Sequence, residues 1–336
     1  MDRDQHELQF LGFPGVYRES SKIILKWRKI FAQITLALIL PLCVVFLAHS
    51  LVSHLLTFRI VDHEDDRDYA SEGSQSYRDL SHALKKEWVA FWLTMLGYFI
   101  FVFIFSLLST SAVVYTVACI YAAKQITFKK IMSVVPRVWK RLMATFLWTF
   151  VTFVAFFVVA VALLIGWVVI VSAFLVGSGL AIAVLVILLI LYVVVFVYLT
   201  MIWQLASVIS VLEDVYGRKA MVKSRRLIKG KMGMSVGCFL GVMLWSALVE
   251  GLFECLVVLD LVQGIGIKIA GGLICLLLLL MVVLFDLVVQ TVIYFVCKSY
   301  HHENIDKSSL SEHLEVYLGD YVPLKANSVQ LEQLHV

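Results

Sequence analysis

Length, composition and charge together exclude a water-soluble globular protein. The chain has 336 residues, of which 61% are hydrophobic and 15% are charged, and its formal net charge is +4. A mean hydropathy of +0.93 is typical of a protein whose bulk lies in a lipid bilayer. With only 4 prolines and no Ser-rich or Gln-rich tract, a large disordered region is excluded as well.

Six long apolar segments dominate the chain. Each exceeds the roughly 20 residues that a helix needs to cross a bilayer core about 30 Å thick, whereas barrel strands are about 10 residues long. We therefore predict an all-α polytopic membrane protein. Its spans are expected at residues 30–56, 88–123, 144–174, 180–212, 232–262 and 267–296. The 88–123 segment is expected to be one span, because splitting it would put an acidic and a basic loop on the same side.

The distribution of lysine and arginine predicts the orientation. Most of the 28 basic residues lie in the N-terminal segment, the second and fourth connections and the C-terminal tail. Such segments remain on the cytosolic side. We therefore expect a cytosolic basic segment at residues 1–29, a membrane domain at 30–298 and a cytosolic tail at 299–336.

Three basic segments, at residues 17–30, 128–142 and 218–230, each lead directly into a span. In the second segment, apolar residues recur at helical spacing on one face, so an amphipathic helix lying in the headgroup plane is predicted. The residues on that face are Phe128, Ile131, Val135, Val138 and Leu142. Pro136 lacks a backbone N–H, so a bend and a new helix are expected there.

The basic helices are candidate binding surfaces for anionic cytosolic lipids, at roughly 1 kcal/mol for each basic residue, or for a protein partner. The candidate contacts are Lys129, Lys130, Arg137, Lys140, Arg141, Lys223, Arg225 and Arg226. The alternative is that these residues only fix the topology and support the spans. Nucleic acid is not an expected partner, because the bilayer is the nearer polyanion.

The third basic segment contains a pattern of spaced polar and small residues. It consists of Glu213, Asp214, Gly217, Ala220, Ser224, Leu227 and Gly230. This pattern resembles the signature of the membrane domain found beside bacterial glycerophosphodiester phosphodiesterases. The resemblance implies a membrane platform without the hydrolase activity, which belongs to a separate soluble barrel.

Chain length and layout are also similar to a plant family of uncharacterised six-span membrane proteins. Some members carry the label polyadenylate-binding protein-binding protein, which we do not take to imply RNA binding.

Polar residues inside the spans suggest a second function. Glu250 and Glu254 lie one turn apart in the fifth span, and Asp286 and Gln290 share a face of the sixth. Intramembrane carboxylates are costly and usually face a bundle interior or a water-filled path. They indicate either polar contacts between the last two spans, with a wet outer vestibule, or a proton or cation pathway that includes Gln204.

The fifth span begins with Gly233, Gly237 and Gly241, which fall on one helix face. Glycines at this spacing let two helices approach closely. The pattern indicates packing within the bundle or a contact between two copies of the chain.

The connection between the first two spans carries alternating acids from Asp62 to Asp68. A calcium loop would need a glycine where Arg67 stands, so a solvated acidic loop is expected instead.

No catalytic motif, metal-ligand spacing or phosphate-binding loop is found, so we expect neither an enzyme nor a cofactor. The favoured function is a non-enzymatic lipid- or partner-binding platform in membrane organisation or trafficking, and the alternative is a transporter or channel.

Tyr321–Leu324 resembles a tyrosine-based sorting signal, and no terminal retrieval signal is found. The compartment therefore stays open between the plasma membrane and the endomembranes of the endoplasmic reticulum and Golgi.

Overall fold

A computed structural model describes residues 10–70, 74–122, 127–174, 178–259 and 264–301, and the structural statements here concern those residues. Within them every regular element is a helix, which confirms the all-α class. The elements are α2 (Phe13–Lys26), α3 (Arg28–Ile34), the π-helical turn η1 (Thr35–Ile39), α4 (Leu40–Tyr69), α5 (Gln75–Tyr121), α6 (Phe128–Phe174), α7 (Ser178–Leu212), α8 (Arg218–Ile228), α9 (Met232–Phe253), the π-helical turn η2 (Glu254–Val258) and α10 (Ile265–Tyr300). The suggested sorting signal at Tyr321–Leu324 lies outside the described residues.

Six of the described helical segments are long and apolar enough to cross a membrane, so the chain is an integral membrane protein. They are Arg28–Tyr69, Gln75–Tyr121, Val138–Ala173, Gly179–Leu212, Met232–Val258 and Ile265–Tyr300. Each contains one of the predicted spans or most of it. The second is a single unbroken helix, as expected for residues 88–123.

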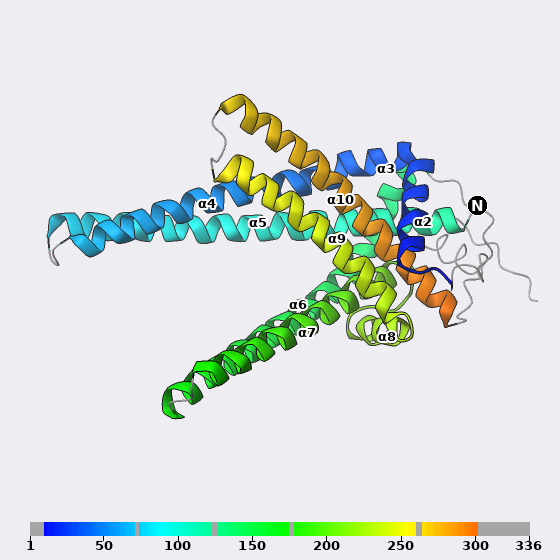
Figure 1. Ribbon diagram of the computed structural model, residues 1–336. Helices are drawn as coiled ribbons and strands as arrows, with labels where there is room; N and C mark the ends of the chain where they lie inside the picture. Colours follow the sequence, from blue (N-terminus) through cyan, green and yellow to red (C-terminus); the bar gives the residue numbers. More distant parts are fainter. Residues whose placement is uncertain (1–9, 71–73, 123–126, 175–177, 260–263, 302–336) are drawn as a thin grey trace, which may run out of the picture.

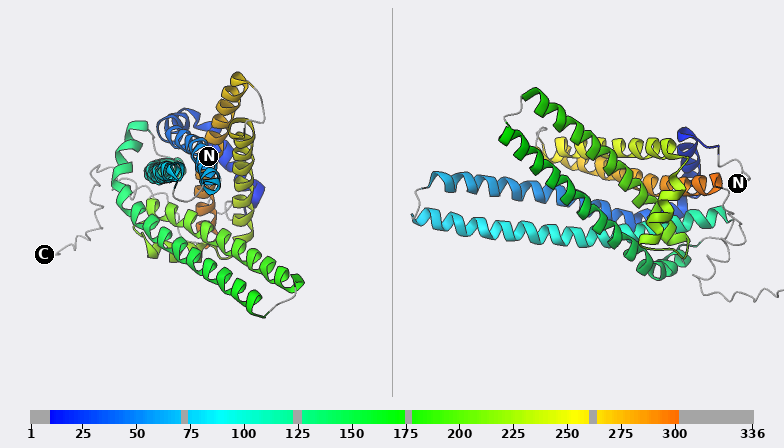
Figure 2. Two further views of the ribbon diagram at one scale, coloured as in Figure 1. Left: turned by 90° about the vertical axis from the view of Figure 1, so that its left-hand side faces the viewer. Right: turned by 90° about the horizontal axis from the view of Figure 1, so that it is seen from below.

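The spanning helices form three antiparallel hairpins, α4 with α5, α6 with α7, and α9 with α10. Figure 1 shows the hairpins diverging from one shared end, and both views of Figure 2 agree. The short helices α2 and α8 lie across the spans at that end. We call this end the base; it includes α2, α8, the starts of α6 and α9 and the ends of α5, α7 and α10.

The protein core is concentrated at the base. Residues 109–120 of α5 and 287–297 of α10 are buried without interruption. A helix buried on all sides lies at the centre of its bundle, so α5 and α10 form the central pair there. Away from the base the α6–α7 hairpin is exposed: none of the most apolar window of α6 is buried inside the protein.

The acidic connection between the first two spans is helical, so the expected loop is wrong. Helix α4 continues to Tyr69 and includes all the acids from Asp62 to Asp68. Backbone hydrogen bonds of a helix are internal and need no apolar side chains. Ion pairs also support the extension, because Glu64 lies 3.7 Å from Arg67 and His63 of α4 lies 2.9 Å from Glu87 of α5.

Pro136 does not start a new helix, which is a second correction. Helix α6 is continuous from Phe128–Phe174 with Pro136 inside it, and its first part curves around the base in Figure 2. Val134, Val135 and Val138 are at most 2% exposed. Tertiary packing of these neighbours therefore holds the helical path despite the hydrogen bond that a proline removes.

Candidate functional site

Glu213, directly after α7, joins three helices at the base. Its carboxylate accepts hydrogen bonds from Tyr294 Oη at 2.6 Å and Lys298 Nζ at 3.2 Å, both on α10. Lys223 Nζ of α8 lies 2.7 Å away. Burial raises the pKa of Glu213, but the hydrogen bonds from Lys223 and Tyr294 and the charge of Lys298 together outweigh burial and hold the pKa below its usual value. The carboxylate is therefore charged at neutral pH.

Asp214, the next residue, makes a more exposed contact. Its carboxylate lies 2.5 Å from Arg141 Nη1 of α6, and 58% of the Asp214 side chain is exposed. An exposed pair of this kind contributes little stability compared with a buried network. Glu213 is thus the stronger of the two adjacent anchors.

Gly217 makes the turn between α7 and α8 with a φ of +63° and a ψ of −136°, a conformation that only glycine adopts readily. Its N–H donates to Thr145 Oγ1 of α6 at 2.7 Å, and Thr145 in turn contacts Ser210 Oγ of α7 at 2.6 Å. A Cβ atom at Gly217 would lie 3.1 Å from the Trp148 side chain. The turn therefore depends on the absence of a side chain.

The other residues of the spaced pattern fix α8 to the bundle. Ala220, Ser224 and Leu227 are at most 2% exposed, and Ser224 Oγ donates to the Ile202 carbonyl at 2.8 Å. Gly230, with a φ of +96°, packs against the Tyr300 ring. Every residue of the pattern thus lies in α8 or in one of the two turns that flank it.

The C-terminal end of α8 is capped from α10. His301 Nε2 lies 3.1 Å from the Leu227 carbonyl and 3.0 Å from that of Lys229. Because carbonyl oxygens only accept, Nε2 must carry the proton. This bond satisfies acceptors that a helix end leaves open.

The outer face of α8 carries the cations. Arg218, Lys219, Arg225 and Arg226 are exposed there. A groove along this face is lined by Arg218, Lys219, Val222, Lys223, Arg226 and Leu227. The outer face is therefore basic around one exposed apolar residue, Val222, whereas the inner face is buried.

The predicted headgroup contacts divide into two groups. Lys129, Lys140, Arg225 and Arg226 are exposed, whereas Lys130, Arg141 and Lys223 are partly buried. Of the latter, Arg141 pairs with Asp214 and Lys223 with Glu213. The Arg137 side chain lies outside the described part of the structure.

The glycine face of α9 receives α2. A Cβ atom at Gly237 would lie 3.3 Å from the Phe13 ring, and one at Gly241 would meet the Tyr17 hydroxyl, whereas Gly233 has open space around it. Tyr17 Oη donates to the Cys238 carbonyl at 2.8 Å. Burial, with smaller effects from Cys238 and Asp286, raises the pKa of Tyr17 to about 12, so the hydroxyl is a neutral donor. Gly237 and Gly241 therefore contact α2, a short helix lying across the spans.

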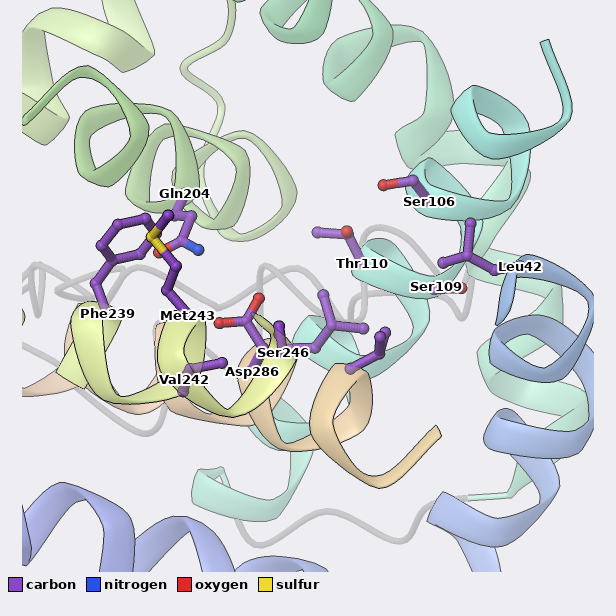
Figure 3. A pocket seen from close by; sticks show the side chains of 12 residues that line it. Leu42, Ser106, Ser109, Thr110, Gln204, Phe239, Val242, Met243, Ser246 and Asp286 are labelled. Carbon is purple, nitrogen blue, oxygen red and sulfur yellow. The ribbon is translucent and has the colours of Figure 1, made fainter. Parts of the chain in front are cut away.

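A cavity of about 290 Å³ with both polar and apolar lining residues lies between the hairpins. Its lining residues are Leu42, Ser106, Ser109, Thr110, Gln204, Phe239, Val242, Met243, Ser246, Val283, Asp286 and Leu287. Figure 3 shows the Asp286 carboxylate projecting into the space between Gln204 and Thr110. A second cavity of about 180 Å³ shares Asp286 and Gln204 and adds Gln290. The structure therefore brings these three residues together.

Glu250 and Glu254 lie elsewhere. Both are exposed on the surface of the fifth span and line neither cavity. Glu250 is about 27 Å along α9 from Met232, near the end of a core about 30 Å thick. The four polar residues singled out in the spans thus belong to two separate places.

Sequence reasoning missed Thr145, Tyr294 and Lys298. Their hydrogen bonds to Gly217 and Glu213 join residues 72 to 85 positions apart in the chain, so no local spacing identifies them. The signal in the sequence was weak: Tyr294 and Lys298 are a polar pair one turn apart at the end of an apolar helix.

Fold and base together define an all-α, multi-pass integral membrane protein. The chain belongs to a family described as a domain of unknown function, DUF8558, whose model matches residues 1–334. No curated protein matches the chain. No solved structure matches it either.

Proposed function

We propose that the protein is a non-enzymatic membrane platform whose base lies at the cytosolic leaflet and binds anionic lipid headgroups along α8. One observation carries this proposal. The inner face of α8 is fixed to the bundle, and its outer face presents exposed cations around Val222, which is 46% exposed. Such a surface matches a phosphate group above a short apolar contact.

The orientation comes from the bias of lysine and arginine toward the base, which the positive-inside rule assigns to the cytosol. Helix α8 lies across the spans, as seen in Figure 2, and we take it to be an amphipathic interfacial helix. Lys129 and Lys140 at the start of α6 are also exposed at the base. Each such residue near an anionic leaflet contributes about 1 kcal/mol.

The Glu213 network supports the proposal because it preorganises α8. Lys223, Tyr294 and Lys298 hold the junction in place through that carboxylate, so α8 does not have to be ordered when lipid binds. Preorganisation of this kind raises affinity by lowering the entropy lost on binding.

The test compares lipid binding to the purified full-length chain in neutral detergent. The ligands are short-chain phosphatidylserine and phosphatidylcholine. We expect tighter binding of phosphatidylserine, and a loss of roughly 10- to 30-fold in Arg225→Gln/Arg226→Gln.

The matched control is Lys85→Gln/Lys86→Gln, which removes two exposed charges from α5 far from the base and should bind like the wild type. Equal binding of both lipids, or equal losses in the two double variants, would contradict the proposal.

A further inference from the structure

Asp286 is the acidic residue of the cavity between the hairpins, and among the described residues its carboxylate has no hydrogen-bond or ion-pair partner. Among the described residues, no cationic side chain lines either cavity. Within the same part of the chain, no hydrogen bond or ion pair joins the Asp286 carboxylate to another group. A carboxylate placed like this needs a compensating cation or proton from outside the chain.

Asp286 lies deep in the span, so a charged carboxylate there strongly requires a compensating cation or proton. Helical rise places Asp286 about 18 Å along α10 from Lys298, which lies at the base. That is near the middle of a core about 30 Å thick. Unlike Glu250, which lies near the opposite end of its span, Asp286 cannot reach bulk water by extending its side chain.

The polar groups described around the Asp286 carboxylate are hydroxyls and an amide, and none of them carries a charge. The Ser109 hydroxyl donates to the Phe105 carbonyl at 2.6 Å, so toward the cavity it can only accept. Gln204 carries both an amide oxygen that accepts and an NH₂ group that donates. Because no cationic side chain is among the described lining residues, a charged Asp286 carboxylate disfavours an anionic ligand and favours a cation.

The size and the apolar part of the lining define the class of cation. A volume of about 290 Å³ exceeds what one bare metal ion needs, and no cluster of three or more metal-ligating residues occurs in the described ranges. Phe239 and Met243 line the same cavity. An aromatic ring and a thioether suit hydrocarbon and an adjacent ammonium group.

We propose that this cavity binds a small organic ammonium cation, with the ammonium group at Asp286 and the hydrocarbon portion against Phe239 and Met243. The site lies inside the bundle and is independent of lipid binding along α8.

The experiment measures equilibrium binding of 2-phenylethylammonium to the full-length protein in lipid nanodiscs at neutral pH. The neutral comparison ligand is 2-phenylethanol, which has nearly the same shape without the charge. We expect the ammonium compound to bind the wild type, and Asp286→Asn to weaken this binding by about 10- to 100-fold while leaving the alcohol unaffected. Glu250→Gln, which neutralises a carboxylate outside the cavity, should match the wild type.

A second variant keeps the test decisive if Asp286→Asn fails to fold. Ser246→Phe places a ring in the cavity and leaves residue 286 as aspartate, and it should also abolish binding in protein that remains monodisperse. Binding that persists in folded Asp286→Asn or in Ser246→Phe would overturn the proposal. So would equal affinity for the alcohol and the ammonium compound, or no binding by monodisperse wild type.

Discussion

The base and the part of the α6–α7 hairpin that extends away from it are stabilised differently. Leu142 and Leu163 lie on the same helix, yet Leu142 is 1% exposed and Leu163 is 53% exposed. At the base, side chains from several helices surround each other. Along the hairpin, the lipid supplies the surroundings instead.

The contrast between the base and the hairpin shows which contacts hold the helices together. Apolar side chains gain no hydrophobic free energy by leaving lipid for another helix, because both surroundings are apolar. Close packing, hydrogen bonds and ion pairs must therefore hold the helices together. The described structure concentrates those contacts at the base, around Glu213, Gly217 and Thr145. Five pairs of measurements test this view.

The largest effect is expected from truncating a buried leucine. Leu142→Ala should lower the free energy of unfolding by about 2–4 kcal/mol, because it leaves a void in close-packed surroundings. Leu163→Ala should change it by less than about 0.5 kcal/mol, as surface substitutions do. Thermal unfolding followed by tryptophan fluorescence measures both, and equal losses would show that the hairpin is as tightly specified as the base.

The next comparison is between two glycines. Gly217→Ala should cost about 2 kcal/mol, because its backbone conformation suits only glycine and its Cβ would press on Trp148. A Cβ atom at Gly166 of α6 would have nothing within 4 Å, so Gly166→Ala should be neutral or slightly stabilising. The same unfolding assay applies, and a harmless Gly217→Ala would contradict the role of the turn.

The third comparison is between the two adjacent carboxylates, Glu213 and Asp214. Glu213→Gln should cost about 2 kcal/mol, because it leaves Lys223 and Lys298 partly buried without their counter-charge. Asp214→Asn should cost less than about 1 kcal/mol, because its pair with Arg141 is exposed. If the two variants were equally unstable, Glu213 would not be the principal anchor.

Two glycines of α9 give a smaller difference. Gly241→Ala should displace Tyr17 of α2, whereas Gly233→Ala adds the same methyl group to open space. Both gain helix propensity, so the difference between them, about 1 kcal/mol, reports overpacking against α2. Faster proteolytic cleavage after Arg18 or Lys22 in Gly241→Ala alone would show that α2 is loosened, and identical cleavage would count against this packing.

The smallest effect is a pH dependence. The pKa of Glu213 is lower in the folded protein than its ordinary value of 4.5, so its stabilising effect is fully present above that value. The effect is lost as the pH falls through the lower, folded-state pKa. Wild-type stability should therefore decline more steeply than that of Glu213→Gln in this acidic window, measured by thermal unfolding at a series of pH values. Parallel curves would refute the assignment.

Hydropathy predicted the six spans because it reports where lipid surrounds the chain. Hydropathy could not predict where helices end, since α4 continues past its apolar residues through the acids near Asp66. Nor could it predict the path through Pro136, which tertiary packing decides. Asp286 and Gln290 were identified because they interrupt an apolar run, but the separation of Asp286 from Glu250 depends on depth and helix rotation in three dimensions.

The divergence of the three hairpins also affects the membrane itself. Because the three hairpins diverge from the base (Figure 1), the protein covers a smaller area of the leaflet at the base than of the opposite leaflet. Lipid acyl chains must occupy the space between the diverging hairpins, so these lipids are part of the packing of the protein. The angle between the hairpins is therefore coupled to the lateral pressure of the bilayer.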